Sequence, residues 1–131
     1  MSITVDASVF VAAARRTDVH HSASREFLFS VASEALPLIC PTLVLPECTA
    51  ALARETGDSA LAARLAHVVL DTAALQLVAL DVPRAQRAAE IAASQRLKGA
   101  DSIYVAVAEE FGAELVTVSY THLTLPTNRE V

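Results

Sequence analysis

The sequence is poor in the residues that stack on bases, ligate metals through sulfur or build phosphate-binding loops. Among its 131 residues are no tryptophan, two tyrosines and four phenylalanines, which give little support to base stacking on single-stranded nucleic acid. Its three glycines form no glycine-rich loop, which excludes a Rossmann or P-loop nucleotide site. Cys40 and Cys48 lack CxxC spacing and nearby metal-ligand histidines, so we expect both thiols to be reduced and buried.

A membrane signature is also missing, although the chain is unusually apolar. Hydrophobic residues make up 53% of it, and the mean hydropathy is +0.43. The most apolar stretch, residues 43–53, is interrupted by Pro46 and Glu47 and falls short of the roughly 18 residues of a membrane span. The N-terminus has neither the basic start nor the cleavage site of a signal peptide. We therefore expect a cytoplasmic protein whose surplus hydrophobicity serves a protein–protein surface.

Positive charge is scarce. Ten basic residues face fifteen acidic ones, for a net charge of −5, which argues against a broad basic surface for nucleic acid. This balance still suits an enzyme whose acids hold a metal ion and whose few cations contact phosphates locally. Nine of the ten basic residues are arginine, whose guanidinium group, unlike the lysine ammonium, can donate two parallel hydrogen bonds to one phosphate.

Short β-like runs alternate with longer stretches of helical periodicity. We expect strands at residues 3–5, 36–40, 75–80 and 114–118. The spacing predicts helices from residue 7, over 22–35, over 41–55, from 58, over 83–99 and over 100–111. Such alternation is typical of a parallel sheet with helices on both faces. The expected fold class is therefore α/β, a three-layer α/β/α domain with a short central parallel sheet over residues 1–118.

The character of the sequence changes after residue 118. Residues 119–131 contain no alanine, are rich in threonine, include Pro126 and show no helical period. We treat them as an atypical C-terminal tail, with the hypothesis that they derive from a truncated or mis-joined reading frame. An uninterrupted genomic frame encoding this segment would contradict the hypothesis.

Three acidic residues are predicted to meet at the carboxyl edge of the sheet, where ligands of open parallel sheets bind. Asp6 follows the first strand, Glu47 lies in the first turns of the helix after the second strand, and Asp101 opens the helix before the fourth. Converging carboxylates raise one another's pKa unless a cation occupies the site. Mg²⁺ or Mn²⁺ suits such oxygen ligands and can support phosphodiester hydrolysis.

Each acid also has an ordinary structural interpretation. Asp6 and Asp101 are each well placed to cap the helix that they begin, and Glu47 can be a solvated first-turn acid. The spacing alone leaves these alternatives open. Phosphate contact and stabilisation of a helix dipole are likewise both open for four basic residues: Arg15, Arg16, Arg96 and Lys98.

Two further features are predicted to be structural. His20 and His21 are adjacent and lack the i,i+4 spacing of a helical metal pair, so we expect a solvated helix entry. Tyr104 lies within an apolar helical stretch and is expected in the core.

Three local strings resemble the acidic motifs of PIN domains. Val5-Asp6-Ala7-Ser8 resembles their opening motif, the string from Pro41 to Glu47 resembles the second, and that from Lys98 to Ala108 the third. The order and separations of these strings, together with His20-His21, are similar to the VapC branch of the family over about residues 1–118.

The resemblance implies a magnesium- or manganese-dependent endoribonuclease, the toxin of a toxin–antitoxin pair. Asp6 and Asp101 then look like metal ligands, Glu47 like the acid that positions a metal-bound water, and Ser8 like the hydroxyl that orients the acids. It also implies an RNA substrate, a small antitoxin that covers the site, and a homodimer.

The sequence departs from the family pattern at one position. The family usually places a fourth acid just after the fourth strand, whereas residues 115–118 are followed here by Ser119. A serine lacks the charge of a carboxylate, so metal affinity should fall. This favours a second hypothesis, a catalytically weak PIN-like module that mainly binds a partner protein.

A receiver-like phosphoacceptor domain fits poorly, because no acidic pair precedes Asp6 and Lys98 stands before a helix.

Overall fold

The computed structural model describes residues 1–118 and 128–130 of the chain. Its strands form one sheet of order β3-β2-β1-β4-β5, in which every neighbouring pair is parallel. The strands are β1 (Ile3–Val5), β2 (Leu38–Pro41), β3 (Leu75–Val78), β4 (Glu114–Thr117) and β5 (Asn128–Glu130). The short edge strand β5 had not been predicted from the sequence.

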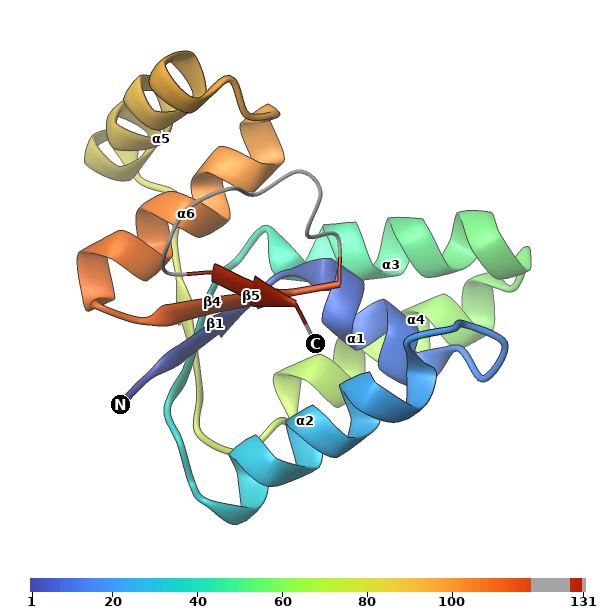
Figure 1. Ribbon diagram of the computed structural model, residues 1–131. Helices are drawn as coiled ribbons and strands as arrows, with labels where there is room; N and C mark the ends of the chain where they lie inside the picture. The colour runs from blue at the N-terminus through green and yellow to red at the C-terminus, as the bar shows by residue number, and fades with distance from the viewer. Residues whose placement is uncertain (119–127, 131) are drawn as a thin grey trace.

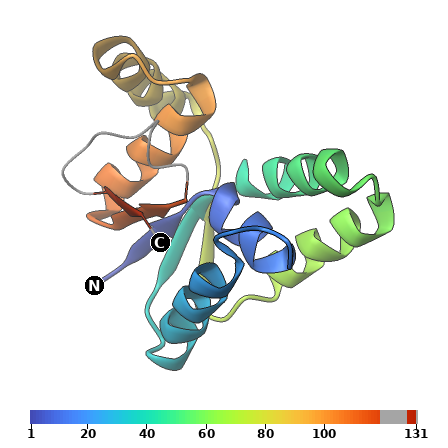
Figure 2. The same cartoon turned by 45° about the vertical axis from the view of Figure 1, so that its right-hand side comes forward.

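Helices cover both faces of this sheet. They are α1 (Ala7–Ala14), α2 (His21–Ser33), α3 (Val44–Thr56), α4 (Ser59–Leu70), α5 (Val82–Gln95) and α6 (Gly99–Phe111). Figures 1 and 2 show α5 and α6 on one side of the sheet and α1 to α4 on the other. The predicted three-layer α/β/α architecture with a parallel sheet is therefore confirmed.

The boundary between β2 and α3 differs from the prediction. Pro41 was expected to open the helix, but it is the last residue of β2 and pairs with Val78, and α3 begins at Val44. The amide of Thr42 then donates to the Val78 carbonyl at 2.9 Å. Proline is tolerated at the end of a strand, where the ladder continues through the next amide. As a result, Pro46 and Glu47 fall in the first turns of α3.

The core is built from apolar side chains of the central strands and of α6. Val5, Leu38 and Val116 are fully buried, as expected for strands covered on both faces. Both cysteines are free and buried, as predicted, and burial raises the pKa of Cys40 to about 12.

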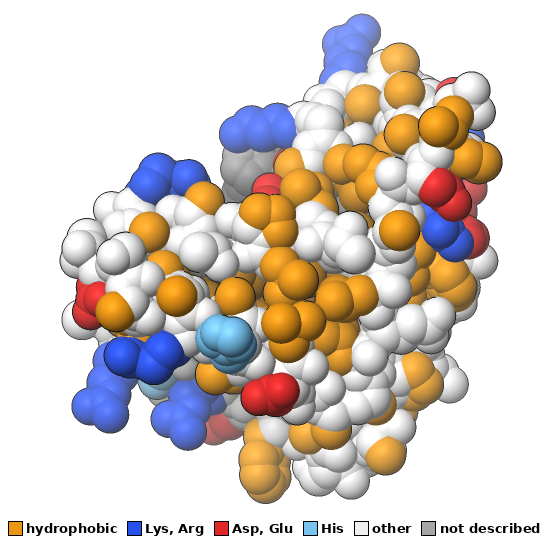
Figure 3. Space-filling model, turned by 180° about the vertical axis from the view of Figure 1, so that it is seen from behind, with side chains coloured by type: hydrophobic (Ala, Val, Ile, Leu, Met, Phe, Trp, Pro, Cys, Tyr) orange, Lys and Arg blue, Asp and Glu red, His pale blue; other side chains and the backbone are white. Residues whose placement is uncertain are grey.

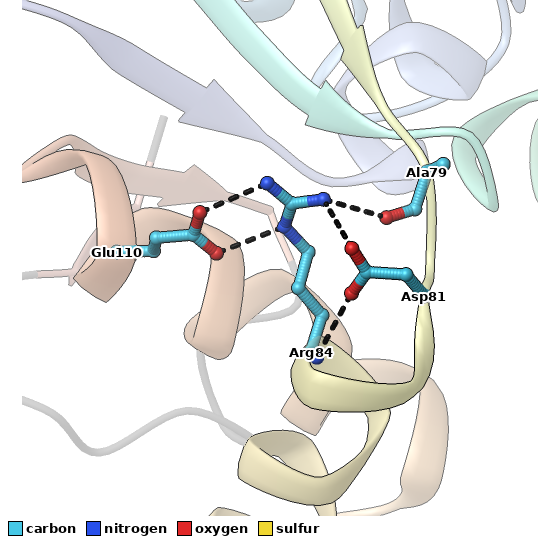
Figure 4. Close-up of polar contacts among 4 residues, drawn as sticks. All are labelled: Ala79, Asp81, Arg84 and Glu110. Carbon is cyan, nitrogen blue, oxygen red and sulfur yellow. Dashed lines mark hydrogen bonds and ion pairs between the residues drawn. The ribbon is translucent and has the colours of Figure 1, made fainter.

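Helix α5 buries only two of its residues, and a polar cluster fastens its first turn to α6. The Arg84 guanidinium donates two hydrogen bonds of 2.9 Å to the Glu110 carboxylate (Figure 4). It also donates to Asp81 at 3.1 Å and to the carbonyl of Ala79 at 3.2 Å, both just before the helix. A bidentate pair of this kind fixes geometry as well as adding attraction.

Several large hydrophobic side chains remain exposed. The most exposed beyond the first residue are Val19, Phe29, Val68, Leu70, Leu80 and Val82. Apolar side chains gather across the middle of the face in Figure 3. Within the described part of the chain, no helix has both the length and the apolarity needed to cross a membrane.

Candidate active site

A cleft of about 750 Å³ opens at the carboxyl edge of the sheet, between the ends of β1 and β4, the first turns of α1 and α6, and one side of α3 as far as its last turn. Asp6, Glu47 and Asp101 all line it, and so does Ser8. The three acids come from three separate elements, and the topology brings them to one cleft. This is the edge at which the sequence had placed them.

Asp6 is held by hydrogen bonds from two directions. Its Oδ1 accepts from the backbone amide of Ser8 at 3.1 Å and from the Ser8 hydroxyl, and its Oδ2 accepts from the Thr117 hydroxyl at 2.6 Å. The amide of Val118 in turn donates to Ser8 Oγ at 3.1 Å. The end of β1, the start of α1 and the end of β4 are therefore joined around one carboxylate.

Thr117 had not been predicted from the sequence as a site residue. The register of the parallel strands explains its place, because β1 and β4 pair Val5 with Val116. The next residue on each strand is then Asp6 and Thr117, side by side. The side chain of Thr117 is fully buried, so its hydroxyl is a fixed donor to the carboxylate.

The surroundings of Asp6 disfavour its ionised form. Burial raises the pKa of this carboxyl, which is 6% exposed, and the negative charge of Asp101 raises it further. The hydrogen bonds from Ser8 and Thr117 lower the pKa but do not offset the burial. A nearby cation would favour the ionised form.

Glu47 is more than a solvated first-turn acid. The Tyr104 hydroxyl on α6 donates a 2.7 Å hydrogen bond to Glu47 Oε1 on α3. Tyr104 is 1% exposed, which confirms its predicted place in the core. Burial and the neighbouring Glu47 both raise the pKa of the phenol, so it remains a donor. The apolar surroundings of Tyr104 in the sequence gave no signal of this contact.

Asp6 and Asp101 differ in whether they occupy the N-cap of a helix. Asp6 does cap α1, through the hydrogen bond from the Ser8 amide, and it lines the cleft as well. Lys98, and not Asp101, occupies the N-cap position of α6, so the capping interpretation of Asp101 was wrong. Asp101 lies in the first turn of α6, within the cleft.

Two cations share the cleft with these acids. Arg54 and Lys98 both line it, and within the described residues neither side chain forms a hydrogen bond or ion pair. Arg15 instead pairs with Glu55 on α3 at 3.4 Å. Arg54 had not been singled out in the sequence.

The two histidines stand at a helix entry, as predicted, but both are half-buried and not simply solvated. His20 is the N-cap residue of α2 without a side-chain capping bond, and a ring nitrogen of His21 lies 2.9 Å from the Ala12 carbonyl. Because a carbonyl only accepts, this Nδ1 carries the proton.

The carboxylate oxygens of Asp6 are the type of ligand that a magnesium ion binds. A carboxylate has about four acceptor positions, and the hydrogen bonds to Asp6 occupy two on Oδ1 and one on Oδ2. Among the described residues, nothing takes the second acceptor position on Oδ2, which a ligand could therefore use, and Asp101 lies near enough to affect the pKa of Asp6. Magnesium is commonly held by one or two carboxylates together with waters and substrate phosphate.

The described residues do not by themselves supply a complete set of metal ligands. In the part of the chain that the structure describes, no three His, Cys, Asp or Glu side chains form a group that could hold an ion by themselves. Ser119, at the position of the family's fourth acid, lies outside the described residues.

Comparisons with known proteins find solved structures with a similar fold. No curated protein sequence matches the chain. A crystal structure of VapC20 of Mycobacterium tuberculosis, a toxin that cleaves the sarcin–ricin loop, superposes with a TM-score of 0.74 at 22% identity, covering 89% of this chain and 88% of that one. VapBC2 of Rickettsia felis, solved with a DNA fragment of its promoter, gives a TM-score of 0.74 at 13% identity over 99% and 98%. A toxin–antitoxin complex of Klebsiella pneumoniae gives 0.71 at 18% over 99% and 100%.

These identities are low enough that the likeness concerns the fold. The sequence model of the PIN domain, by contrast, matches residues 3–118, which include all three predicted acids and Ser8. On this match, the chain belongs to the PIN domain family.

Proposed function

We propose that this protein is a magnesium- or manganese-dependent endoribonuclease and the toxin of a toxin–antitoxin pair. The observation that carries the proposal is the convergence of Asp6, Glu47 and Asp101 from three elements on one cleft at the carboxyl edge of the sheet. The fold that it shares with VapC20, described as a toxin that cleaves the sarcin–ricin loop, supports the reaction class.

In this proposal Asp6 and Asp101 hold the metal ion, and Ser8 and Thr117 keep the Asp6 carboxylate in place. A bound divalent ion would neutralise charge on the phosphodiester and make a water more acidic. Glu47 orients the attacking water and accepts its proton on Oε2, because Oε1 already accepts from Tyr104.

Arg54 and Lys98, which line the same cleft as the acids, are proposed to contact RNA phosphates. Among the residues that the structure describes, five acidic side chains line the cleft, namely Asp6, Asp18, Glu47, Glu55 and Asp101, so an RNA backbone would otherwise be repelled. Arg54 and Lys98 are the two basic residues in this described part of the lining. Neutralising them should therefore raise the KM for RNA in a salt-dependent way.

A second candidate is a PIN-like module that cleaves weakly and mainly binds a partner protein. Ser119 in place of a carboxylate favours it, as does the lack of a three-ligand group among the described residues. In either case we propose a small antitoxin as partner, a homodimer and a cytoplasmic location. The exposed apolar side chains in Figure 3 support a protein–protein surface.

Cleavage assays distinguish the two candidates. Wild-type protein should cleave single-stranded RNA with Mg²⁺ or Mn²⁺, and Asp6→Asn and Asp101→Asn should each abolish cleavage. Asp71→Asn, at the C-cap of α4 and outside the cleft, is the matched control and should remain active. Cleavage that survives both cleft substitutions would exclude the proposed site. Inactive wild type that gains activity in Ser119→Asp would identify a damaged nuclease.

Metal binding has a readout that is independent of cleavage. A ligand that binds only the folded state raises its stability. Magnesium should therefore raise the Tm of the wild type and not that of Asp6→Asn.

The domain boundary at residue 118 and the foreign origin of residues 119–131 also remain proposals. The genomic DNA downstream of codon 118 tests the origin of residues 119–131 directly, since a continuous frame through Ser119 would contradict that hypothesis.

A further inference from the structure

Helix α6 presents two polar groups to the cleft from adjacent turns. Asp101 and Tyr104 are three residues apart, which places them on one face of the helix, and both line the cleft. The Tyr104 ring is packed in the core at 1% exposure, yet its hydroxyl lies 2.7 Å from Glu47 Oε1. This hydrogen bond joins α6 to α3 across a sequence separation of 57 residues.

We propose that Tyr104 is a positioning residue for Glu47, fixing the carboxylate so that Oε2 faces the substrate. This inference rests on the proposed nuclease function. The phenol has one hydrogen, which it gives to Oε1, so the hydrogen bond distinguishes the two oxygens of the carboxylate.

The buried ring explains why tyrosine suits this role. A glutamate side chain has several rotamers, and holding it in one of them costs conformational entropy. The Tyr104 ring cannot move with the glutamate, because residues Tyr104 to Ala108 of α6 are all buried. The donor is therefore held in place before substrate binds. Without it, the half-buried Glu47 would share its time among rotamers that point into the open cleft.

Tyr104→Phe removes the hydroxyl and keeps the ring. We expect kcat for RNA cleavage to fall about tenfold, the scale of one hydrogen bond to a charged group, with KM for RNA unchanged. In a Glu47→Gln background the same substitution should cause no further loss, because Tyr104 acts through Glu47. Equal losses in both backgrounds, or an unchanged kcat in Tyr104→Phe, would overturn the proposal.

A cycle on thermal stability in chelator tests the contact without cleavage. The Tm changes of Tyr104→Phe and Glu47→Leu should fail to add in the double variant, since each removes the same hydrogen bond. Glu90→Gln on α5, whose partner is Arg87, is the control and should add to Tyr104→Phe. Additive changes for Tyr104 and Glu47 would overturn the contact. Wild type that cleaves no RNA, with non-additive Tm changes, would instead refute the proposed function and leave the contact supported.

Discussion

Replacing Thr117 with valine should destabilise the metal-free protein measurably. The hydroxyl is fully buried and donates to Asp6 Oδ2 at 2.6 Å, within a carboxylate that is itself 6% exposed. A hydrogen bond to a charged group contributes about 1.5–3 kcal/mol, and its loss leaves the Asp6 oxygen underbonded. We therefore expect the free energy of unfolding of Thr117→Val to fall by about that amount.

Thr4→Val supplies a matched control on the neighbouring strand. Thr4 is also fully buried, but within the described residues its hydroxyl oxygen has no hydrogen-bond partner. Removing a buried, unpaired hydroxyl is neutral or stabilising. Both substitutions exchange the same hydroxyl for the same methyl group in one sheet, so strand propensity and volume cancel in the comparison.

Urea denaturation at pH 7 in chelator measures the difference. The midpoint should fall in Thr117→Val and stay or rise in Thr4→Val, with the slope m unchanged in both. Equal free-energy changes for the two variants would refute the reasoning, because the Thr117 hydroxyl is hydrogen-bonded to Asp6 and lies 3.3 Å from Ser8 Oγ, whereas within the described residues the Thr4 hydroxyl has no partner.

Three further outcomes are expected. Because burial raises the pKa of Asp6 above its unfolded value near 3.8, the folded protein loses stability as the pH rises through the folded pKa. The Tm of metal-free Asp6→Asn relative to that of the wild type should therefore rise between pH 3.8 and pH 7, and a Tm difference that does not change with pH would contradict this. Cys40 and Cys48, buried and with raised pKa values, should react with a thiol reagent at pH 8 only after unfolding, and fast labelling of folded protein would contradict this. Arg84→Lys loses the two-bond contact with Glu110, so amide exchange should accelerate in α5 and not in α3, as hydrogen–deuterium exchange can measure.

The acids of the candidate site could be placed from the sequence because topology alone decides their position. Asp6 follows a strand, while Glu47 and Asp101 lie in the first turns of α3 and α6, which line the same cleft. In a parallel sheet all strands run the same way, so residues after them meet at one edge whatever the strand order. The alternation of strands and helices was therefore sufficient evidence.

The groups that hold those acids required more than alternation. Thr117 reaches Asp6 only because the first strand in the sequence pairs with β4, in the register Val5 to Val116. Helical and strand periods contain neither the strand order nor the register. Tyr104 presents a similar difficulty. Its position on the apolar face of a helix predicts that it lies in the core, and this pattern does not indicate that its hydroxyl reaches the cleft.

The structural and functional interpretations of Asp6 are compatible because they use different acceptor positions. Oδ1 serves the helix cap and the Ser8 hydroxyl, whereas Oδ2 accepts from Thr117 and keeps one position for a ligand. The hydrogen bonds fix the carboxylate without making its charge favourable, since burial still raises its pKa. Proteins commonly lose stability where a site needs a buried charge. If the proposed metal binds here, it should therefore stabilise the wild type, because it offsets the cost of the buried negative charge. Asp6→Asn has no such charge and should not gain this stability.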